Sequence, residues 1–211
     1  MSQNGDKFTI KIVKDNFESA LSKEDDVRLK EYLDSFEELN KFFTLMGTIF
    51  GFVSKDLKAK MDLLKELLVN SGENFSSVKE MIEYEKENEL LNKKGYTSGS
   101  RTLLRLHRGL DFIRLFLQKL GELKDDEYAS TVCREAYEQT LSKHHPFIIR
   151  NGAKVAIYAL PTKGVLLGRV CGEPENIQQA LELLPDTLTA TSLVFERTEN
   201  LFTLHDLHTL P

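Results

Sequence analysis

One long amphipathic stretch, Ser98–Leu120, constrains the fold of this chain more than any other segment. Its leucines and its isoleucine recur at helical spacing, and a serine stands at its start, so the pattern predicts a single long helix. Arg101, Arg105 and Arg108 follow one another at intervals of four and three residues, so they stack along one face. Like charges at that spacing repel, and cations near a helix start oppose its dipole. The stripe therefore favours an anion-binding helix, although a solvated basic face explains the spacing equally well.

The rest of the chain also shows helical periodicity, although residues 7–13 taken alone alternate like a short strand. Clear β-strand patterns, internal repeats and a linker are missing from the sequence. We therefore predict an all-α fold with one domain over residues 1–211. The predicted helices cover 7–21, a periodic segment over 27–69, 76–92, 98–120, 127–143 and 146–160, followed by two or three shorter helices that end near 202.

Composition narrows the class of function. A net charge of −5 and a pI near 5.6 argue against nucleic acid as a partner. Cys133 and Cys171 lack metal-ligand spacing and are expected to be free thiols that pack in the core of a protein in a reducing compartment. The N-terminus does not resemble a secretory signal, and no apolar run approaches about 18 residues. We expect a cytoplasmic protein without a bound metal or cofactor.

A charged pair interrupts one apolar stripe. The stripe continues at the same step onto Asp56 and Lys60, where a buried face is expected. Charges at such positions are costly unless they are paired or bind a ligand, and a simple ion pair four residues apart accounts for them equally well. The apolar members of the stripe are Leu39, Phe42, Met46, Ile49 and Val53.

Recognisable catalytic motifs are missing from the sequence, including a glycine-rich phosphate loop and an activated serine. His107, His205 and His208 are expected to be core or surface histidines rather than ligands. By contrast, His145 directly precedes Pro146, a residue that suits the first turn of a helix, so His145 is placed at or just before a helix start.

Five separated residues resemble the pattern of the glycolipid transfer protein superfamily: Asp56, Lys60, Arg101, Arg105 and His145. The similarity covers nearly the whole chain and is closest to the branch of the family that binds ceramide-1-phosphate. It extends through residues 45–56, 144–147, 159–162 and 210–211. The resemblance implies a two-layer helical sandwich of about eight or nine helices that admits lipid chains between its layers.

The resemblance also implies roles for these residues. Asp56 would accept a hydrogen bond from the ceramide amide N–H, and His145 would bind the amide carbonyl. A phosphate monoester carries about −1.5 to −2 charge near neutral pH, so two or three cations can neutralise it. The cations implied for that clamp are Lys60, Arg101, Arg105 and, in support, Arg108.

The residue type at position 105 indicates whether the lipid head group is a sugar or a phosphate. Glycolipid-binding members place a sugar-stacking tryptophan at this position, whereas this chain contains no tryptophan, and a cation suits phosphate. We therefore expect ceramide-1-phosphate rather than a glycosylceramide. Phe147 stands where relatives often carry a membrane-inserting tryptophan, and Lys93 and Lys94 stand where relatives use arginines to touch anionic lipids.

The expected function is transfer of ceramide-1-phosphate between membranes by a monomer that touches membrane surfaces transiently, with the Golgi, plasma membrane and nuclear envelope as candidates. No covalent step is needed, so no catalytic residue is assigned. Transfer or sensing of another sphingolipid, a phosphohydrolase, and a helical adaptor with a basic docking patch remain alternatives. The candidate lining of the lipid-chain pocket, which core packing explains equally well, is Phe42, Met46, Ile49, Phe50, Val53, Leu110, Ile113, Leu117, Ile149, Val155 and Ile157.

Overall fold

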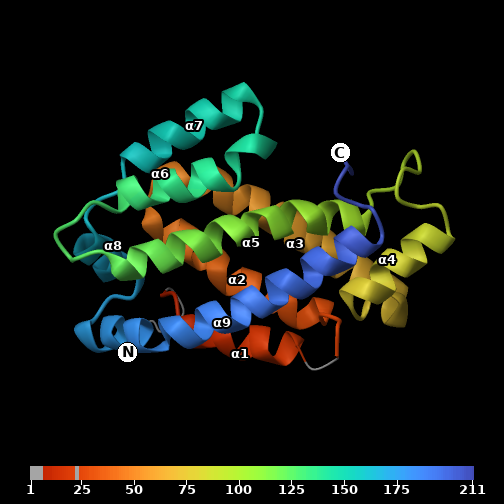
Figure 1. Ribbon diagram of the computed structural model, residues 1–211, viewed down its shortest axis with the longest axis horizontal. Coiled ribbons are helices and arrows are strands. Elements are labelled where there is room, and N and C mark those ends of the chain that lie inside the picture. The colour runs from red at the N-terminus through yellow and green to blue at the C-terminus, as the bar shows by residue number, and fades with distance from the viewer. Residues whose placement is uncertain (1–6, 22–23) are drawn as a thin grey trace.

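The computed structural model describes residues 7–21 and 24–211 (Figure 1). This part of the chain forms nine α-helices and three short 3-10 helices, which confirms the predicted all-α class. No described helix has the length and apolar character needed to cross a membrane. The helices are α1 (Ile10–Ala20), α2 (Leu29–Met46), α3 (Gly51–Ser71), α4 (Val78–Glu87), α5 (Gly99–Glu122), α6 (Ala129–Gln139), α7 (Phe147–Tyr158), α8 (Lys163–Val170) and α9 (Pro174–Leu204), with η1 (Thr48–Phe50), η2 (Gly72–Phe75) and η3 (Ser142–His144) between them.

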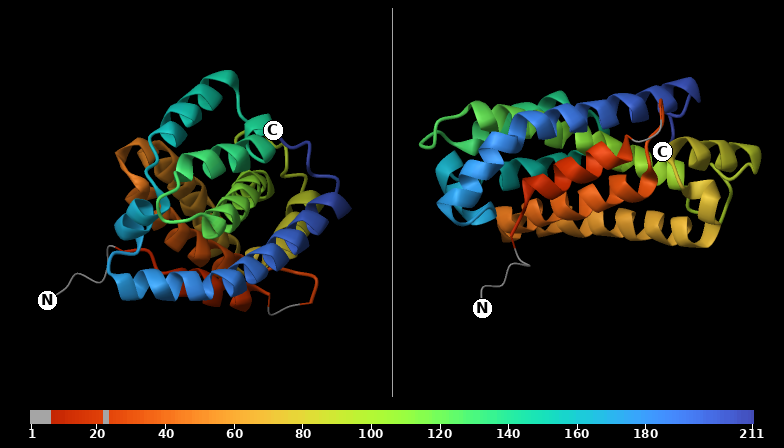
Figure 2. Two further views of the ribbon diagram at one scale, coloured as in Figure 1. Left: turned by 60° about the vertical axis from the view of Figure 1, so that its left-hand side comes forward. Right: turned by 90° about the horizontal axis from the view of Figure 1, so that it is seen from below.

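The helices form two layers around an apolar core. Helices α2 and α3 lie in one layer and α5 and α9 in the other, as the view from below in Figure 2 shows. Helix α1 packs against both α2 and α9, and α3 packs against α5. This is the predicted two-layer sandwich.

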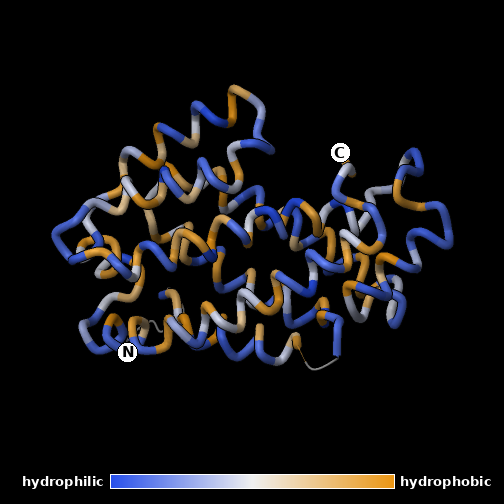
Figure 3. Tube along the Cα trace, in the orientation of Figure 1, coloured by the Kyte–Doolittle hydropathy of each residue, from blue (hydrophilic) through white to orange (hydrophobic). Residues whose placement is uncertain are grey.

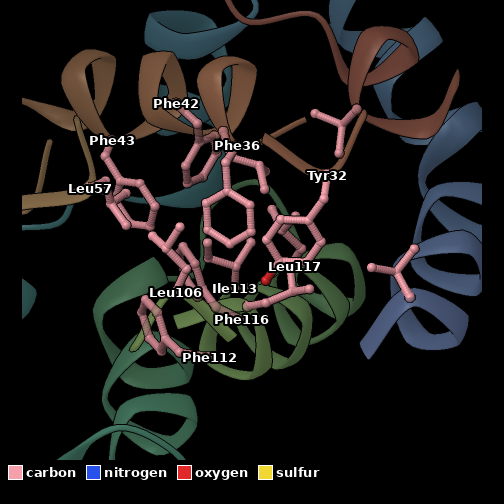
Figure 4. Packing of buried hydrophobic residues seen from close by; sticks show 14 of the residues in the cluster. Tyr32, Phe36, Phe42, Phe43, Leu57, Leu106, Phe112, Ile113, Phe116 and Leu117 are labelled. Atoms are coloured by element: carbon pink, nitrogen blue, oxygen red, sulfur yellow. The ribbon is translucent and has the colours of Figure 1, made fainter. Parts of the chain in front are cut away.

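Aromatic side chains fill much of the space between the layers (Figure 4). Phe36 and Phe42 come from α2, and Ile113 and Phe116 meet them from α5; all four are at most 3% exposed. Burying a side chain of this size contributes roughly 1.5–3 kcal/mol each. The same packing fixes α5, the helix that carries the predicted basic stripe, against α2.

Helix α5 matches the prediction for 98–120 closely. Ser98 is its N-cap, and its Oγ accepts a hydrogen bond from the backbone N–H of Arg101 at 3.1 Å. The buried carboxylate of Glu85 on α4 also reaches this helix start, where it accepts from the backbone N–H groups of Gly99 at 2.6 Å and Ser100 at 2.9 Å. A carboxylate there satisfies free N–H groups and opposes the positive end of the helix dipole.

The periodic segment over 27–69 is not one helix, so that part of the prediction is wrong. Helix α2 ends at Met46, the next residue Gly47 has φ +132° and ψ 161°, and a 3-10 turn leads into α3. Only glycine adopts this region readily, so the chain changes direction there and the apolar stripe does not run straight through. Val53 and Asp56 therefore lie on a different helix from Phe42.

Two other predicted helices are shorter than expected. The helix predicted over 76–92 is α4, which ends at Glu87, and Glu89 follows with φ +53°. The one predicted over 127–143 is α6, which ends at Gln139 before the separate turn η3. A positive φ lies outside the right-handed helical region, so α4 does not continue through Glu89.

Proline did not end the last helix as predicted. Helix α9 runs for 31 residues from Pro174 to Leu204 and passes through Pro185, where a break between shorter helices was expected. Proline removes one backbone hydrogen bond of a helix and crowds the preceding turn. Helix α9 packs along both α1 and α5, and these contacts offset the local cost.

Candidate functional site

A cavity of about 470 Å³ opens between α3, α5, α6 and α7. Most of its wall is apolar, and a few charged or hydrogen-bonding side chains share it. A volume of roughly 300–1,000 Å³ with this kind of wall is typical of small-molecule sites. The lining residues are Phe43, Phe50, Phe52, Val53, Asp56, Leu57, Lys60, Arg105, Arg108, Gly109, Phe112, Ile113, Cys133, Tyr137, Leu141, His144, His145, Ile149, Ala153, Ala156, Ile157 and Pro211.

Most of the wall is built from stripes of residues on α-helices. Residues at steps of three and four on one helix face the same side, and each of four helices contributes such a set. Helix α3 supplies 52, 53, 56, 57 and 60; α5 supplies 105, 108, 109, 112 and 113; α6 supplies 133 and 137; and α7 supplies 149, 153, 156 and 157. Continuing the arginine stripe along α5 would have found Phe112, a wall residue that the sequence analysis missed.

Asp56 and Lys60 form an ion pair one turn apart on α3. The side chain of Asp56 is 67% exposed, whereas that of Lys60 is 16% exposed, and both residues border the cavity. The simple ion pair considered in the sequence analysis is therefore present, and it sits on the cavity wall. Because the aspartate is well solvated, the pair contributes little to stability and stays available to a ligand.

Two arginines of α5 also line the cavity, and both donate to main-chain oxygens of residues 208–211. Arg105 donates to the main-chain oxygen of Pro211 at 3.0 Å, and Arg108 donates to that of His208 at 2.8 Å. Neither forms an ion pair with an acidic residue of 7–21 or 24–211. Burial, together with the neighbouring Arg105, lowers the pKa of Arg108. Lys60 is paired with Asp56, so the two arginines are the cations of the wall that lack an ion-pair partner among the described residues.

Arg101 is not part of the cavity wall. It is half-buried one turn before Arg105 on the same face of α5. Of the four predicted phosphate ligands, the structure brings Lys60, Arg105 and Arg108 to one cavity and leaves Arg101 beside it.

His145 borders the cavity just before α7, as predicted from the proline that follows it. Its Nδ1 lies 2.9 Å from the hydroxyl of Tyr137. Burial lowers the pKa of His145, with nearby Lys60 acting in the same direction and Asp56 against it, so the ring is neutral at pH 7. His144 is a wall residue that was missed; burial and the charge of Arg108 lower its pKa as well.

The predicted apolar lining is right in part. Five of its members border the cavity, whereas four are buried in the core and two are exposed. The stripe over 39–53 was extrapolated across Gly47, where the chain turns. The members of the stripe before this turn therefore face the core and not the cavity. The lining members are Phe50, Val53, Ile113, Ile149 and Ile157; the core members are Phe42, Met46, Leu110 and Leu117; the exposed ones are Ile49 and Val155.

The candidate membrane contacts are all on the surface. Phe147 is 68% exposed at the start of α7, and its neighbour Ile148 is 80% exposed. Figure 3 shows this outer end of α7 as a hydrophobic segment that projects from the body of the molecule. Lys93 and Lys94 are exposed in the connection between α4 and α5.

The other histidines and the cysteines have structural surroundings. His107 is buried, stacks on Phe195 with ring centroids 4.3 Å apart, and lies 2.6 Å from a carboxylate oxygen of Glu199. Cys133 and Cys171 are buried free thiols, as predicted, although Cys133 also touches the cavity.

A two-layer helical sandwich around an apolar cavity, with cationic side chains in the cavity wall, is the architecture of a known class of protein. Residues 27–172 match the sequence model of the glycolipid transfer protein (GLTP) family, and the chain belongs to that family.

Particular relatives within the family carry a more specific name. The chain is 36% identical to the ceramide-1-phosphate transfer protein of Danio rerio, over 98% of this chain and 99% of that one. The crystal structure of the mouse ceramide-1-phosphate transfer protein in its apo form superposes with a TM-score of 0.89 at 35% identity, covering 97% of this chain and 100% of that chain. The human protein in complex with 12:0 ceramide-1-phosphate superposes with a TM-score of 0.86 at 32% identity and the same coverage.

Proposed function

We propose that this protein binds ceramide-1-phosphate and carries it between membranes without vesicles. The observation that supports this most directly is the meeting of Lys60, Arg105 and Arg108 at one apolar cavity. Relatives named for this lipid, at 33–36% identity over nearly the full chain, support the same head group.

The phosphate is assigned to the cations of α3 and α5. Arginine forks meet phosphate oxygens two at a time, and the ammonium of Lys60 supplies a third donor. Arg101 is retained as an outer contact because it lies one turn from Arg105 on the same helix face. Because Lys60 is paired with Asp56, Arg105 and Arg108 supply the two positive charges that match the roughly −1.5 to −2 charge of the phosphate monoester.

The amide of the ceramide is assigned to Asp56 and His145. A carboxylate only accepts hydrogen bonds, which suits the amide N–H, and a neutral imidazole donates one, which suits the carbonyl. Both residues border the cavity together with the cations. The pair would therefore fix the orientation of the lipid below its head group.

The hydrocarbon chains are assigned to the apolar part of the cavity. Each methylene transferred from water into an apolar environment contributes about 0.8 kcal/mol, so two long chains face a barrier on the order of 20 kcal/mol or more in water. An apolar sleeve removes most of that barrier. Transfer requires no bond to form or break, so the proposal assigns no enzymatic step.

Exposed residues of α7 and the α4–α5 connection are assigned to transient membrane contact. Phe147 and Ile148 would enter the interface, while Lys93 and Lys94 would face anionic head groups. The proposal includes a monomer that works in the cytoplasm and meets membranes such as the Golgi, plasma membrane or nuclear envelope.

Mass spectrometry of copurifying lipid and vesicle-to-vesicle transfer test the proposal together. The wild type should retain ceramide-1-phosphate and transfer it faster than glucosylceramide. Arg105→Leu should lose the lipid and slow transfer at least tenfold, because a charge-assisted contact to phosphate is worth about 1.5–3 kcal/mol.

Arg134→Leu is the matched control, since Arg134 is an exposed arginine of α6 away from the cavity wall. It should behave like the wild type. Glucosylceramide transfer as fast as that of ceramide-1-phosphate would overturn the head-group assignment.

A further inference from the structure

We propose that Tyr137 is a positioning residue for His145: its hydroxyl holds the imidazole in the tautomer that carries hydrogen on Nε2 and can donate to the lipid amide carbonyl. This inference rests on the proposed function of His145. It concerns a residue of α6 that would not touch the amide itself and acts only through the ring it holds.

The contact joins two cavity residues from different segments. Tyr137 Oη lies 2.9 Å from His145 Nδ1, and the two ring centroids are 5.7 Å apart. Tyr137 is only 4% exposed, and it packs edge-on against Phe112 of α5 at a centroid distance of 6.3 Å. The tyrosine is thus fixed by the core, while His145 lies at the junction between η3 and α7.

Hydrogen-bond accounting sets the direction of this bond. If His145 Nδ1 were the donor, the buried hydrogen of the Tyr137 hydroxyl would need another acceptor. Across the described chain, His145 is the one hydrogen-bond partner found for that hydroxyl. A buried O–H without an acceptor costs roughly 1–3 kcal/mol, so the tyrosine donates and Nδ1 accepts. A neutral imidazole that accepts at Nδ1 carries its hydrogen on Nε2.

The backbone restricts His145 in the same way. Pro146 follows it and biases the preceding residue to extended geometry, and His145 has φ −101° and ψ 135°. Its backbone N–H donates to Ser142 O at 3.3 Å. The main chain therefore fixes the position from which the His145 side chain extends, and the hydrogen bond to Tyr137 fixes the orientation of its ring. Burial also lowers the pKa of His145, which keeps the ring neutral as this arrangement requires.

Nitrogen NMR of the lipid-free protein tests the tautomer directly. With ¹⁵N-histidine, wild-type His145 should show a protonated Nε2 and an unprotonated Nδ1 at pH 7.5. In Tyr137→Phe, the ¹⁵N chemical shift of Nδ1 should move to that of an unprotonated nitrogen that accepts no hydrogen bond. Tyr32→Phe is the matched control, because no partner of the buried Tyr32 hydroxyl is found among the described residues. A protonated Nδ1 in the wild type would overturn the proposal.

Two lipids then separate positioning from general damage. Tyr137→Phe should bind ceramide-1-phosphate in vesicles about fivefold more weakly, the fold-change of one lost neutral hydrogen bond. It should bind a dialkyl-glycerol phosphate, which has the phosphate and two chains but no carbonyl, as tightly as the wild type does. In a His145→Ala background the same substitution should have no further effect.

Equal losses for both lipids, or a full effect of Tyr137→Phe without His145, would overturn the positioning role. A wild type that binds neither ceramide-1-phosphate nor the ether lipid would instead overturn the proposed function, while the NMR result would still decide the orientation of His145.

Discussion

His107 couples the stability of this protein to pH. It is buried against Phe195, and burial lowers its pKa below the ordinary histidine value despite the nearby Glu199 carboxylate. Between the lowered folded pKa and about 6.5, the unfolded state binds more protons than the folded one. The contribution of neutral His107 to the free energy of unfolding is therefore fully present above about pH 6.5, and it is lost as the pH falls through the pKa of His107 in the folded state.

We expect the free energy of unfolding to fall between pH 7 and pH 5, with a shallower slope in His107→Gln. Burial also lowers the pKa of His144 and His145, so a residual slope should remain. Urea unfolding at several pH values measures it. An unchanged slope in the variant would mean that His107 does not titrate in this range.

At the same scale, the sequence located the charged residues of the site better than the apolar ones. Asp56 and Lys60 stand out because charges interrupt an apolar stripe, and Arg105 belongs to a repeat of arginines on one helix face. His145 directly precedes a proline, and its role was implied by the family resemblance. Leucine and phenylalanine at helical spacing look the same whether they face a core or a cavity. Tyr137 was invisible for another reason: its role depends on a contact with a residue eight positions away across a turn.

At the scale of the helices, Gly47 determines where α2 gives way to α3. Its φ of +132° is strained for any residue with a side chain, and a Cβ there would meet no other atom within 4 Å. Gly47→Ala should therefore lower the free energy of unfolding by about 1–3 kcal/mol through backbone strain alone.

Gly51→Ala is the matched control for that prediction. Gly51 has φ −58° at the start of α3, and a Cβ there is also free of contacts. Alanine there should be neutral or stabilise the helix by up to about 1 kcal/mol. Equal effects of the two substitutions in urea unfolding would show that strain at Gly47 is not the cause.

The start of α5 depends on one buried carboxylate. Glu85 is 0% exposed and accepts four hydrogen bonds, two from backbone N–H groups of α5 and two from hydroxyls, those of Tyr96 at 2.8 Å and Ser98 at 2.7 Å. Glu85→Ala would leave these donors without their acceptor. We expect a loss on the order of 3 kcal/mol or more in guanidinium unfolding.

Glu87→Ala, on the exposed side of the same helix, should cost within about 0.5 kcal/mol. Similar losses for the two variants would contradict the assignment of Glu85 as the anchor of α5. This anchor could not be predicted from the sequence, because a glutamate in a charged helix ordinarily faces solvent.

At the scale of the whole molecule, α7 is the least embedded helix, since it packs chiefly on α6. Its exposed Phe147 and Ile148 should insert at a membrane surface, where each side chain can contribute up to about 1.5–3 kcal/mol. Phe147→Asp with Ile148→Asp should therefore weaken binding to vesicles at least tenfold in sedimentation assays. Val69→Asp, at a position 81% exposed on α3, should leave binding unchanged.

Lys93 and Lys94 should tune the response to lipid charge. Replacing both with alanine removes two cations from the α4–α5 connection, each worth about 1 kcal/mol near an anionic surface. Transfer from phosphatidylserine-containing vesicles should slow, whereas transfer from neutral vesicles should not. An unaltered dependence on anionic lipid or on salt would remove these lysines from the membrane contact.

The contacts of Arg105 and Arg108 with main-chain oxygens have a consequence for the turnover of a bound lipid. Both guanidiniums donate to protein oxygens, those of Pro211 and His208. In the proposed function, an arriving phosphate would replace these acceptors, and the same oxygens would take up the guanidinium hydrogens again when the phosphate departs. Only the difference between the two sets of acceptors would then contribute to affinity, which would keep binding moderate and release fast.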